Sequence, residues 1–383
     1  MAPPPQSAGP TLLRRPATEA ARAIDWSKFL KRSLFTSSCF DCNKMITGKT
    51  VLITGAGGSI GSALARCLMG SFAKTLVLLD HSRQHLGRLY REYVERNITL
   101  PQVKFFHADL AREKELENIF SHYRPQIVFH LAAMKRLPEL EHTPFLALEN
   151  NLLGTLRLLL ALDGSDVEQF IHVSTDKAVN PTSILGVSKR ITELVLLAMD
   201  RTEPAVASIR LGNVLGSSGS VVPRFMRCLQ SCRPLTIRDM NASRYFITLE
   251  EAAAFLMNAL EVPGNSLLVP DMGVPLRIEE LADFLLCESR SIIDKKSFRH
   301  TGLRDGEKRD EQLTYEHEYL AGTPSPYLFK ICSTRVLDWE DCIDHVSQLL
   351  ELVVERQKNG LIETLAAIVP EFTPSQTLLS CLQ

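Results

Sequence analysis

The chain has 383 residues, a hydrophobic fraction of 45% and a net charge of -1 at pH 7, which suits one large α/β domain with a smaller lobe. Basic and acidic residues are interspersed, which excludes the sustained positive field that nucleic acid binding needs. No apolar run is long enough to cross a bilayer and the N-terminus lacks the apolar core of a secretory signal, so we expect a cytoplasmic protein without a membrane span.

The first predicted segments precede the main domain. Residues 1–18 are rich in Pro, Ala and Ser and are predicted to be disordered. Residues 19–45 are predicted to form a helical extension that packs on the main domain, from a weakly amphipathic pattern. The nine cysteines are interpreted as free thiols. No second pair or nearby histidine accompanies Cys39 and Cys42, so we expect no metal site there.

Residues 46–215 alternate short apolar runs with helical patterns such as Ser59–Met69. This alternation predicts a doubly wound parallel sheet (a Rossmann fold) that binds NAD at the carboxyl ends of its strands. Residues 216–330 are expected to form a smaller C-terminal substrate-binding lobe, and residues 331–383 a C-terminal helical segment. The expected strands are Lys49–Thr54, Thr75–Asp80, Val103–Ala108, Gln126–Leu131, Glu168–Ser174 and Ala205–Arg210.

A glycine-rich turn follows the first expected strand directly. Gly55, Gly58 and Gly61 have the G-x-x-G-x-x-G spacing, with a strand before them and a helix after them. Glycine permits the tight turn and the close approach of a pyrophosphate, and the helix N-terminus offers free N–H groups at its positive end. We therefore predict a dinucleotide-binding turn that also includes Ser59 and Ile60.

The ends of the next three strands are predicted to complete the cofactor site. Asp80 ends the second strand, where a carboxylate can hold the adenosine ribose hydroxyls and repel a 2′-phosphate. That favours NAD over NADP, although Arg83 is close in the sequence and its positive charge weakens this preference. Asp109 is predicted to meet the adenine, and Ala132 and Ala133 to line the cofactor.

Thr175, Asp176 and Lys177 follow one another at the end of the fifth strand, ahead of a helix that contains Lys189. An Asp–Lys pair by itself is often a surface ion pair. At this end of the fold, however, a hydroxyl, a carboxylate and an amine would face the nicotinamide side of the cofactor. The position relative to the glycine turn therefore favours a catalytic role.

Several ordered stretches resemble the extended short-chain dehydrogenase/reductases, specifically the polysaccharide-biosynthesis branch that contains the UDP-N-acetylglucosamine 4,6-dehydratases. Several matches in order are more specific than any single motif. The resemblance implies NAD as cofactor and a UDP-sugar as substrate, and we expect a homo-oligomer with no metal. The matching stretches are Thr54–Ser62 (TGAGGSIGS), Val173–Pro181 (VSTDKAVNP), Leu211–Pro223 (LGNVLGSSGSVVP), Ser243–Thr248 (SRYFIT) and Gly302–Lys308 (GLRDGEK).

By this resemblance, Thr175, Asp176 and Lys177 match the family's catalytic triplet, and Lys189 matches its cofactor-side lysine. The small soluble members carry a tyrosine four residues before that lysine, and the large members carry methionine. This chain has Leu185 at that position. Leucine cannot deprotonate a hydroxyl, so the family's tyrosine function needs another group here.

The expected reaction begins with hydride transfer from C4 of the sugar to NAD. A neutral Lys177 then removes the C5 proton, a protonated Asp176 donates to the departing C6 hydroxyl, and hydride returns to C6. Burial, with Lys189 nearby, is expected to keep Lys177 neutral. Without a tyrosine, Thr175 or a water molecule handles the C4 hydroxyl proton.

Substrate-binding residues are expected mainly after the last core strand. Asn213 begins a Gly/Ser-rich loop whose backbone N–H groups could reach a diphosphate. Arg244 and Arg304 match family positions that clamp the substrate phosphates. Glu307 is predicted to meet a ribose hydroxyl, and Lys135 to approach the sugar.

Two other functions stay open. A UDP-sugar 4-epimerase uses the same hydride transfer but needs neither a base at C5 nor an acid at C6, so the Asp176–Lys177 pair favours the dehydratase. A protein that binds NAD and a UDP-sugar but has lost catalysis is the alternative that Leu185 favours. The product formed, or intact binding without turnover, discriminates among the three.

Overall fold

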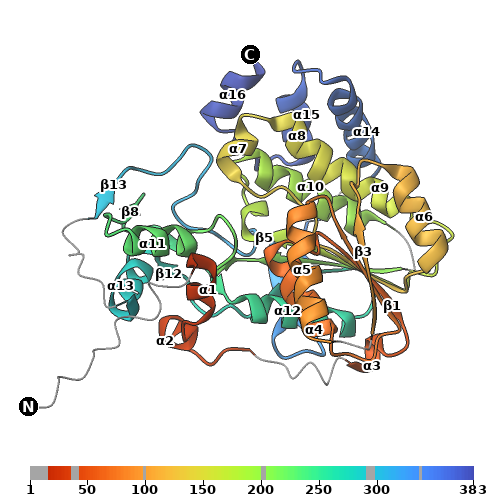
Figure 1. Ribbon diagram of the computed structural model, residues 1–383. Helices are drawn as coiled ribbons and strands as arrows, with labels where there is room; N and C mark the ends of the chain where they lie inside the picture. The colour runs from red at the N-terminus through yellow and green to blue at the C-terminus, as the bar shows by residue number, and fades with distance from the viewer. Residues whose placement is uncertain (1–15, 36–42, 98–100, 200–203, 290–297, 336–338) are drawn as a thin grey trace, which may run out of the picture.

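A nine-stranded sheet forms the centre of the computed structural model, which describes residues 16–35, 43–97, 101–199, 204–289, 298–335 and 339–383. The strand order is β14-β15-β11-β6-β5-β4-β1-β2-β3 (Figure 1). All neighbours from β11 to β3 pair in parallel, whereas β15 and β14 are antiparallel. The Cys39–Cys42 pair lies outside the described residues.

The six predicted strands are present, with bounds within one residue of the prediction. Every residue of β1, β2 and β4 is buried, as expected for parallel strands that are covered on both faces. The strands of this sheet are β1 (Thr50–Thr54), β2 (Thr75–Asp80), β3 (Gln102–His107), β4 (Ile127–His130), β5 (Gln169–Thr175), β6 (Ala205–Leu211), β11 (Ser266–Pro270), β14 (Glu318–Gly322) and β15 (Leu328–Ser333).

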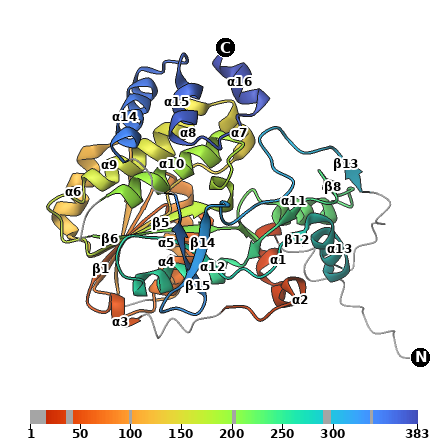
Figure 2. The same ribbon diagram turned by 180° about the vertical axis from the view of Figure 1, so that it is seen from behind.

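Helices cover both faces of the sheet, which confirms the predicted doubly wound α/β fold (Figures 1 and 2). One face carries α4, α5 and α12, and the other carries α6, α9 and α10. Their bounds are α4 (Ser59–Leu68), α5 (Arg83–Glu95), α12 (Leu249–Asn258), α6 (Glu113–Tyr123), α9 (Gly154–Leu160) and α10 (Ile184–Ala198).

The predicted C-terminal helical segment adds a further layer outside α10, at the top of Figure 1. Val346, Leu349 and Val353 are buried in this layer, and Leu350 is partly buried against it. It shares one apolar cluster with α10, α7 and α8, so α10 is enclosed on both sides. The helices are α7 (Leu137–Glu141), α8 (Pro144–Leu148), α14 (Trp339–Glu355), α15 (Leu361–Ile368) and α16 (Gln376–Leu382).

The smaller lobe is assembled from distant segments. The N-terminal helices α1 (Ala17–Arg22) and α2 (Trp26–Leu30) share an apolar cluster with α11 (Val221–Gln230) and α13 (Ile278–Ser289). The extension therefore packs on the lobe, and its later residues also contact the main domain, where Arg32 pairs with Glu251 of α12 and the Phe35 ring stacks on Phe255. The range 216–330 also supplies β11, part of β15 and β14 to the main sheet, so it does not fold as one separate lobe.

Short elements complete the fold. Within the described residues they comprise one further helix, three two-stranded pairs and three tight helical turns. They are α3 (Asn43–Ile46), β7 (Asn213–Val214) with β10 (Phe246–Ile247), β8 (Thr236–Ile237) with β13 (Arg299–His300), β9 (Ser243–Arg244) with β12 (Leu276–Arg277), the π-turn η2 (Glu149–Leu153), and the 3-10 turns η3 (Asp176–Ala178) and η4 (Ala259–Glu261).

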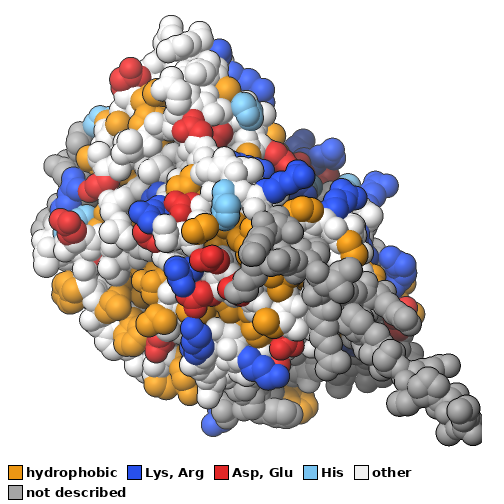
Figure 3. Space-filling model, turned by 90° about the vertical axis from the view of Figure 1, so that its left-hand side faces the viewer, with side chains coloured by type: hydrophobic (Ala, Val, Ile, Leu, Met, Phe, Trp, Pro, Cys, Tyr) orange, Lys and Arg blue, Asp and Glu red, His pale blue; other side chains and the backbone are white. Residues whose placement is uncertain are grey.

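Acidic and basic side chains are interspersed on the face where the lobe lies (Figure 3). In the described part of the chain, no helix is long and apolar enough to cross a membrane, and no group of three or more His, Cys, Asp or Glu could hold a metal ion. Six of the described cysteines are free. Cys67 is disulfide-bonded, so the prediction that all cysteines are free thiols is wrong for this residue.

Candidate active site

The glycine turn after β1 is as tight as the sequence predicts. Gly55 has a φ of +66°, and a Cβ built on it would lie 2.7 Å from the amide nitrogen of Ala132. A Cβ on Gly61 would lie 2.1 Å from the carbonyl oxygen of Gly55. Gly58 is the N-cap of α4 and provides no side-chain cap. The first turn of α4 therefore has N–H groups to offer a ligand.

Asp80 is buried at the end of β2 and contacts the glycine turn. Its carboxylate accepts hydrogen bonds from the N–H groups of Gly57 and Ser82, each at 2.8 Å. In the same region, Ser59 Oγ accepts a hydrogen bond from the N–H of Ser218 at 2.9 Å. Asp80 thus stabilises the turn, and its contact with an adenosine ribose stays a prediction.

The other predicted cofactor residues lie at the carboxyl edge of the parallel strands, next to the glycine turn. Asp109 is exposed after β3, and its carboxylate accepts a hydrogen bond from the N–H of Ala111. After β4, the Ala132 N–H donates to Thr54 Oγ1 at 3.3 Å, and Ala133 is exposed. Ile60 is half-buried on α4. This shared edge is where parallel α/β sheets bind ligands.

The end of β5 brings the three predicted catalytic residues together. The chain turns into η3 after Thr175, so the side chains of Asp176 and Lys177 meet although adjacent residues of a strand point to opposite faces. Lys177 Nζ lies 2.8 Å from Asp176 Oδ1, and Thr175 Oγ1 donates to the same oxygen at 3.0 Å. The geometry therefore supplies a hydroxyl, a carboxylate and an amine at one point.

Two further oxygen atoms surround the Lys177 amine. Asn213 Oδ1 lies 3.3 Å from Nζ, and Glu311 Oε1 lies 3.4 Å from it. The predicted contact of Asn213 with the substrate stays a prediction. Glu311 is buried, with Lys308 Nζ 2.9 Å and Arg244 Nε 3.9 Å from its carboxylate. Sequence reasoning missed Glu311, because a carboxylate in a run of charged residues looks like an exposed one.

The charges in this cluster differ from the sequence-based expectation. Burial alone would lower the pKa of the Lys177 amine, but the carboxylates of Asp176 and Glu311 outweigh burial and raise it. The expected neutral Lys177 is therefore wrong for the resting site, and Lys189 is not among the groups that set its charge. Burial raises the pKa of Asp176, whose Oδ2 has no hydrogen-bond partner among the described residues.

The turn at residues 175–179, which carries the predicted catalytic residues and is called the catalytic turn below, is held from the C-terminal side. The Tyr315 hydroxyl donates to the carbonyl oxygen of Ala178 at 2.7 Å, and Lys308 Nζ donates to that of Val179 at 2.7 Å. On the other side, a Cβ built on Gly186 of α10 would lie 2.4 Å from the Lys177 carbonyl oxygen. Close packing on both sides fixes the direction of the predicted catalytic side chains.

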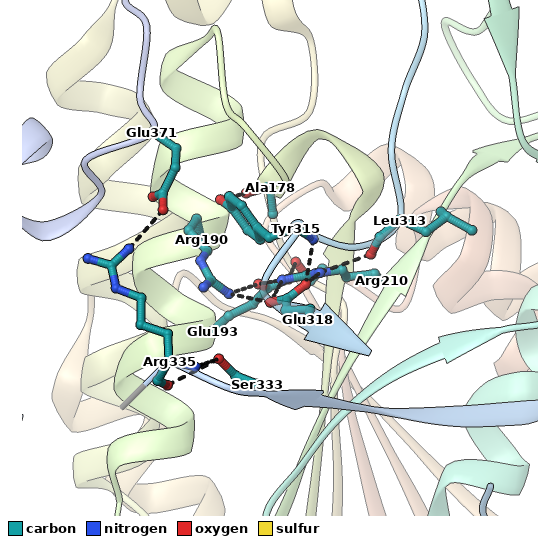
Figure 4. Close-up of polar contacts among 11 residues, drawn as sticks. Ala178, Arg190, Glu193, Arg210, Leu313, Tyr315, Glu318, Ser333, Arg335 and Glu371 are labelled. Atoms are coloured by element: carbon teal, nitrogen blue, oxygen red, sulfur yellow. Dashed lines mark hydrogen bonds and ion pairs between the residues drawn. The ribbon is translucent and has the colours of Figure 1, made fainter. Parts of the chain in front are cut away.

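A buried ion network holds α10 against the sheet (Figure 4). Arg210 of β6 is fully buried and pairs with Glu193 of α10 at 2.8 Å and with Glu318 of β14 at 2.6 Å. Arg190 of α10 pairs with the same two carboxylates at 3.1 and 3.5 Å. The guanidinium of Arg190 also lies 4.6 Å from the centre of the Tyr315 ring. The helix that carries Lys189 is thus linked to the hydroxyl that holds the catalytic turn.

Lys189 lies behind this turn, almost fully buried on α10. Its Nζ donates to the carbonyl oxygen of Val173 at 2.9 Å and contacts His172 Nε2 at 3.1 Å. Burial lowers the pKa of Lys189 to about 8, although the Glu193 carboxylate favours the charged form. Leu185, one turn earlier, is buried in the apolar cluster that α10 shares with the C-terminal helices.

Lys135 is exposed after β4, although surrounding protein and Arg136 lower the pKa of its amine. The preceding residue, Met134, is held by the fully buried Asn151 of the η2 turn. Asn151 Oδ1 accepts from the Met134 N–H at 2.8 Å, and its Nδ2 donates to the Met134 carbonyl at 3.0 Å. Sequence reasoning did not single out Asn151, because a local pattern does not reveal a π-turn.

Arg244 is bonded to the protein, unlike an arginine whose N–H groups are free to bind a phosphate. It is buried, and its guanidinium donates to the carbonyl oxygens of Ser243, Arg309 and Lys308 at 2.6 to 2.8 Å. These bonds hold the loop that carries Glu311. The predicted phosphate contact stays a prediction, and most of the donors it needs are already used.

Three other arginines gather where the diphosphate is expected. Arg304, a predicted phosphate clamp, is exposed, whereas Arg224 of α11 and Arg238 after β8 are partly buried and were not predicted. Burial, followed by the positive charge of Arg304, lowers the pKa of both Arg224 and Arg238. Arg238 forms an ion pair with Glu307, and Arg224 Nε is buried without a hydrogen-bond partner among the described residues. Such a cluster favours an anion.

Residues 51–332 match the family described as "Polysaccharide biosynthesis protein". The chain is 34% identical over 305 residues to the probable polysaccharide biosynthesis protein EpsC of Bacillus subtilis, covering 78% of this chain and 50% of that protein. It is 30% identical over 282 residues to a UDP-glucose 4-epimerase of Rickettsia rickettsii, covering 72% and 80%. It is 29% identical over 296 residues to a UDP-N-acetylglucosamine 4,6-dehydratase (inverting) of Campylobacter jejuni, covering 73% and 84%.

The chain spans about half the length of EpsC and of the similar capsular polysaccharide biosynthesis protein CapD of Staphylococcus aureus. Among solved structures, Pen from Bacillus thuringiensis superposes with a TM-score of 0.67 at 24% identity, covering 76% of this chain and 90% of that one. DesIV from Streptomyces venezuelae, a dTDP-glucose 4,6-dehydratase with NAD and TYD bound, gives 0.59 at 21% identity, covering 69% and 88%. At these identities the likeness shows the fold.

Proposed function

The chain belongs to the polysaccharide biosynthesis protein family, and from that premise we propose that it is an NAD-dependent nucleotide-sugar 4,6-dehydratase. Its proposed substrate is UDP-N-acetylglucosamine or a close UDP-hexose, which it converts to the 4-keto-6-deoxy form. The observation that carries this proposal is the Asp176–Lys177 pair, with 2.8 Å between Oδ1 and Nζ at the carboxyl end of β5. Elimination of water needs a base and an acid beside one sugar, and this pair supplies both.

The residues around the glycine turn fit a dinucleotide. The turn leaves no room for a side chain at Gly55 or Gly61, and α4 begins beside it without a side-chain cap. We propose that this turn holds the pyrophosphate, that Asp80 binds the adenosine ribose, and that Lys189 lies on the nicotinamide side. NAD, when bound, would accept hydride from C4 of the sugar and return it to C6.

The resting ion pair reaches the reactive state by one proton transfer. Moving a proton from Lys177 Nζ to Asp176 Oδ1 makes both groups neutral without changing the net charge. Burial raises the pKa of Asp176 and so lowers the free-energy cost of this transfer. The neutral amine then removes the C5 proton, while the Asp176 carboxyl donates its proton to the C6 hydroxyl, which leaves as water. Lys177 returns a proton to C5 to complete the product.

Thr175 is proposed to replace the tyrosine. Its Oγ1 lies 3.0 Å from Asp176 Oδ1, beside the reacting pair, so it can accept the C4 hydroxyl proton while passing its own proton to a water molecule, because Asp176 already carries the proton from Lys177 at that stage. After elimination and the return of a proton to C5, Asp176 is a carboxylate and Lys177 a neutral amine, and the pair takes one proton back from water, so the protons balance over one cycle. This route needs no ionisable side chain at Leu185.

The test is product analysis in heavy water. Purified protein with NAD and UDP-N-acetylglucosamine should form a 4-keto-6-deoxy sugar with deuterium at C5 and none from solvent at C6, as read by NMR. Lys177→Ala should lower turnover at least ~100-fold, the scale of a lost general base, while NAD affinity stays nearly unchanged. A product that keeps its original C5 proton would contradict the assignment of Lys177.

A UDP-sugar 4-epimerase is the second candidate, favoured by the 30% identity to a protein named UDP-glucose 4-epimerase. In that reaction the C4 ketone is re-reduced on its other face, and Asp176 and Lys177 have no proton to move at C6 or C5. Formation of UDP-N-acetylgalactosamine without solvent deuterium at C5 would decide for the epimerase.

A further inference from the structure

Two buried histidines lie side by side in the sheet. His130 of β4 and His172 of β5 are register partners, both are fully buried, and their ring centres are 5.8 Å apart. Burial lowers the pKa of His130 to about 3 and that of His172 well below its ordinary value, so both imidazoles are neutral. The proposed reaction uses neither of them.

The two rings differ in their partners. His130 is bonded on both nitrogens to hydroxyl groups, with Thr54 Oγ1 and Thr155 Oγ1 each at 2.8 Å. His172 Nδ1 lies 2.8 Å from Ser208 Oγ, but its Nε2 lies 3.1 Å from the Lys189 amine. Only the second ring therefore contacts a residue of the proposed site.

The chemistry of the pair determines the tautomer of His172. A charged Lys189 amine has three N–H donors and no lone pair, so a neutral His172 must present the lone pair of Nε2 to it. The ring proton is then on Nδ1 and points to Ser208 Oγ. A second Lys189 donor is used by the Val173 carbonyl at 2.9 Å, which leaves one N–H for a ligand.

We propose that His172 is a positioning residue for Lys189. It accepts one N–H of the amine and so sets the direction of the N–H that is left for the cofactor, a role that rests on the proposed function of Lys189. The side chain one helical turn before Lys189 is Leu185, which has no polar group to orient the amine. Glu193, the charged residue that acts on Lys189 from its own helix, is already bonded to Arg210.

Three substitutions test this role. His172→Phe removes the acceptor, His172→Gln keeps an acceptor in the side chain, and His130→Phe is the matched control at the register partner. Both Phe variants remove one buried imidazole and its contacts with hydroxyl groups, so their melting temperatures should fall by similar amounts. We expect His172→Phe to weaken NAD binding about 10-fold in calorimetry, and the other two to stay within about 3-fold of the unmodified protein.

A second measurement needs no cofactor. In protein labelled with 13C at the lysine ε-carbon, the Lys189 signal, assigned by its loss in Lys189→Arg, reports the pKa of this amine. His172→Phe should lower that pKa, because the charged amine loses an acceptor, whereas His130→Phe should leave it unchanged. If unmodified protein fails to bind NAD, the proposed function fails, and this titration still decides the role of His172.

Two results would overturn the proposal. The first is that His172→Phe and His130→Phe give the same Lys189 titration and, if NAD binds, the same NAD affinity. His172 would then be a core residue only. The second is a folded His172→Gln protein that behaves like His172→Phe in both measurements, because an acceptor at this position would then have no effect on Lys189.

Discussion

Around Lys177, whose side chain is partly exposed, three buried acidic or basic neighbours meet. Asp176 lies on the same turn, whereas Glu311 and Arg244 come from the C-terminal half of the chain. Burial opposes ionisation of Glu311, but Lys177, Lys308 and Arg244 outweigh it and lower its pKa to about 2. Glu311 is therefore ionised at neutral pH and acts on both members of the proposed catalytic pair.

Replacing Glu311 should move the pH dependence of turnover. Its negative charge raises the pKa of Lys177 and that of Asp176, so Glu311→Gln lowers both. At pH values between the pKa of Asp176 and the pKa of Lys177, the pair holds one proton, which is its reactive state. Both limbs of the kcat/KM profile should therefore shift to lower pH. Glu363→Gln is the control, because Glu363 is exposed on α15 and is not a predicted site residue. An unshifted profile in Glu311→Gln would contradict the role of this charge.

Asp80 should discriminate between NAD and NADP by its charge. Asp80→Asn keeps the shape and one acceptor for the N–H groups of Gly57 and Ser82. We expect NADP, measured by calorimetry, to bind more weakly than NAD in the unmodified protein. The ratio of the NADP to the NAD dissociation constant should fall about 10-fold in Asp80→Asn, equivalent to about 1.4 kcal/mol. Equal affinities for NAD and NADP in the unmodified protein would contradict the assignment of Asp80 to the adenosine ribose.

At the scale of the element, α10 is enclosed between the catalytic turn and the C-terminal helices. Gly186 permits its close approach to the Lys177 carbonyl, while Leu185 joins the apolar cluster of the C-terminal layer. The position that carries tyrosine in the small soluble members is thus an apolar packing position here.

Substitutions at Leu185 test whether this helix belongs to an active enzyme. Leu185→Met conserves volume and should retain turnover, with less than about 1.5 kcal/mol lost from the free energy of unfolding. Leu185→Tyr overpacks the cluster and should cost about 1–3 kcal/mol. Both are measured by denaturation and by product formation. An inert unmodified protein with an active Leu185→Tyr would instead support natural loss of catalysis.

At the scale of the whole molecule, charged groups from distant segments hold the layers together. Arg210 of β6 bonds to α10 through Glu193 and to the antiparallel strand β14 through Glu318. The hydroxyl of Tyr315, just before β14, reaches the catalytic turn. The C-terminal half therefore holds the catalytic turn in place through Tyr315 and supplies the charge of Glu311.

Breaking this network should destabilise the protein strongly. Arg210→Met leaves the Glu193 carboxylate buried with one cation fewer, which costs about 3–5 kcal/mol of unfolding free energy. Arg335→Met is the matched control, because its pair with Glu371 at 2.9 Å is partly exposed (Figure 4) and contributes less than about 1 kcal/mol. Chemical denaturation measures both. Equal losses of unfolding free energy in the two variants would show that burial does not determine how much these ion pairs stabilise the protein.

Much of the fold could be predicted because its signals are local. The buried strands read as continuous apolar runs, and the glycine turn has its strand and helix within ten residues on either side. The assembly of the lobe could not be predicted in this way. Packing of α1 and α2 on α11 and α13 joins segments some 200 residues apart, and no local pattern identifies the partner.

The sequence by itself determined the parallel α/β core, the glycine turn and the placing of Thr175, Asp176 and Lys177 at a strand end, because each depends on neighbours in the chain. Only the tertiary structure decided the charge of Lys177, the use of Arg244 to hold a loop, and the contact of His172 with Lys189. The physical reason is that burial and ion pairing depend on groups that approach from other elements, and their distances are set only when the chain is folded.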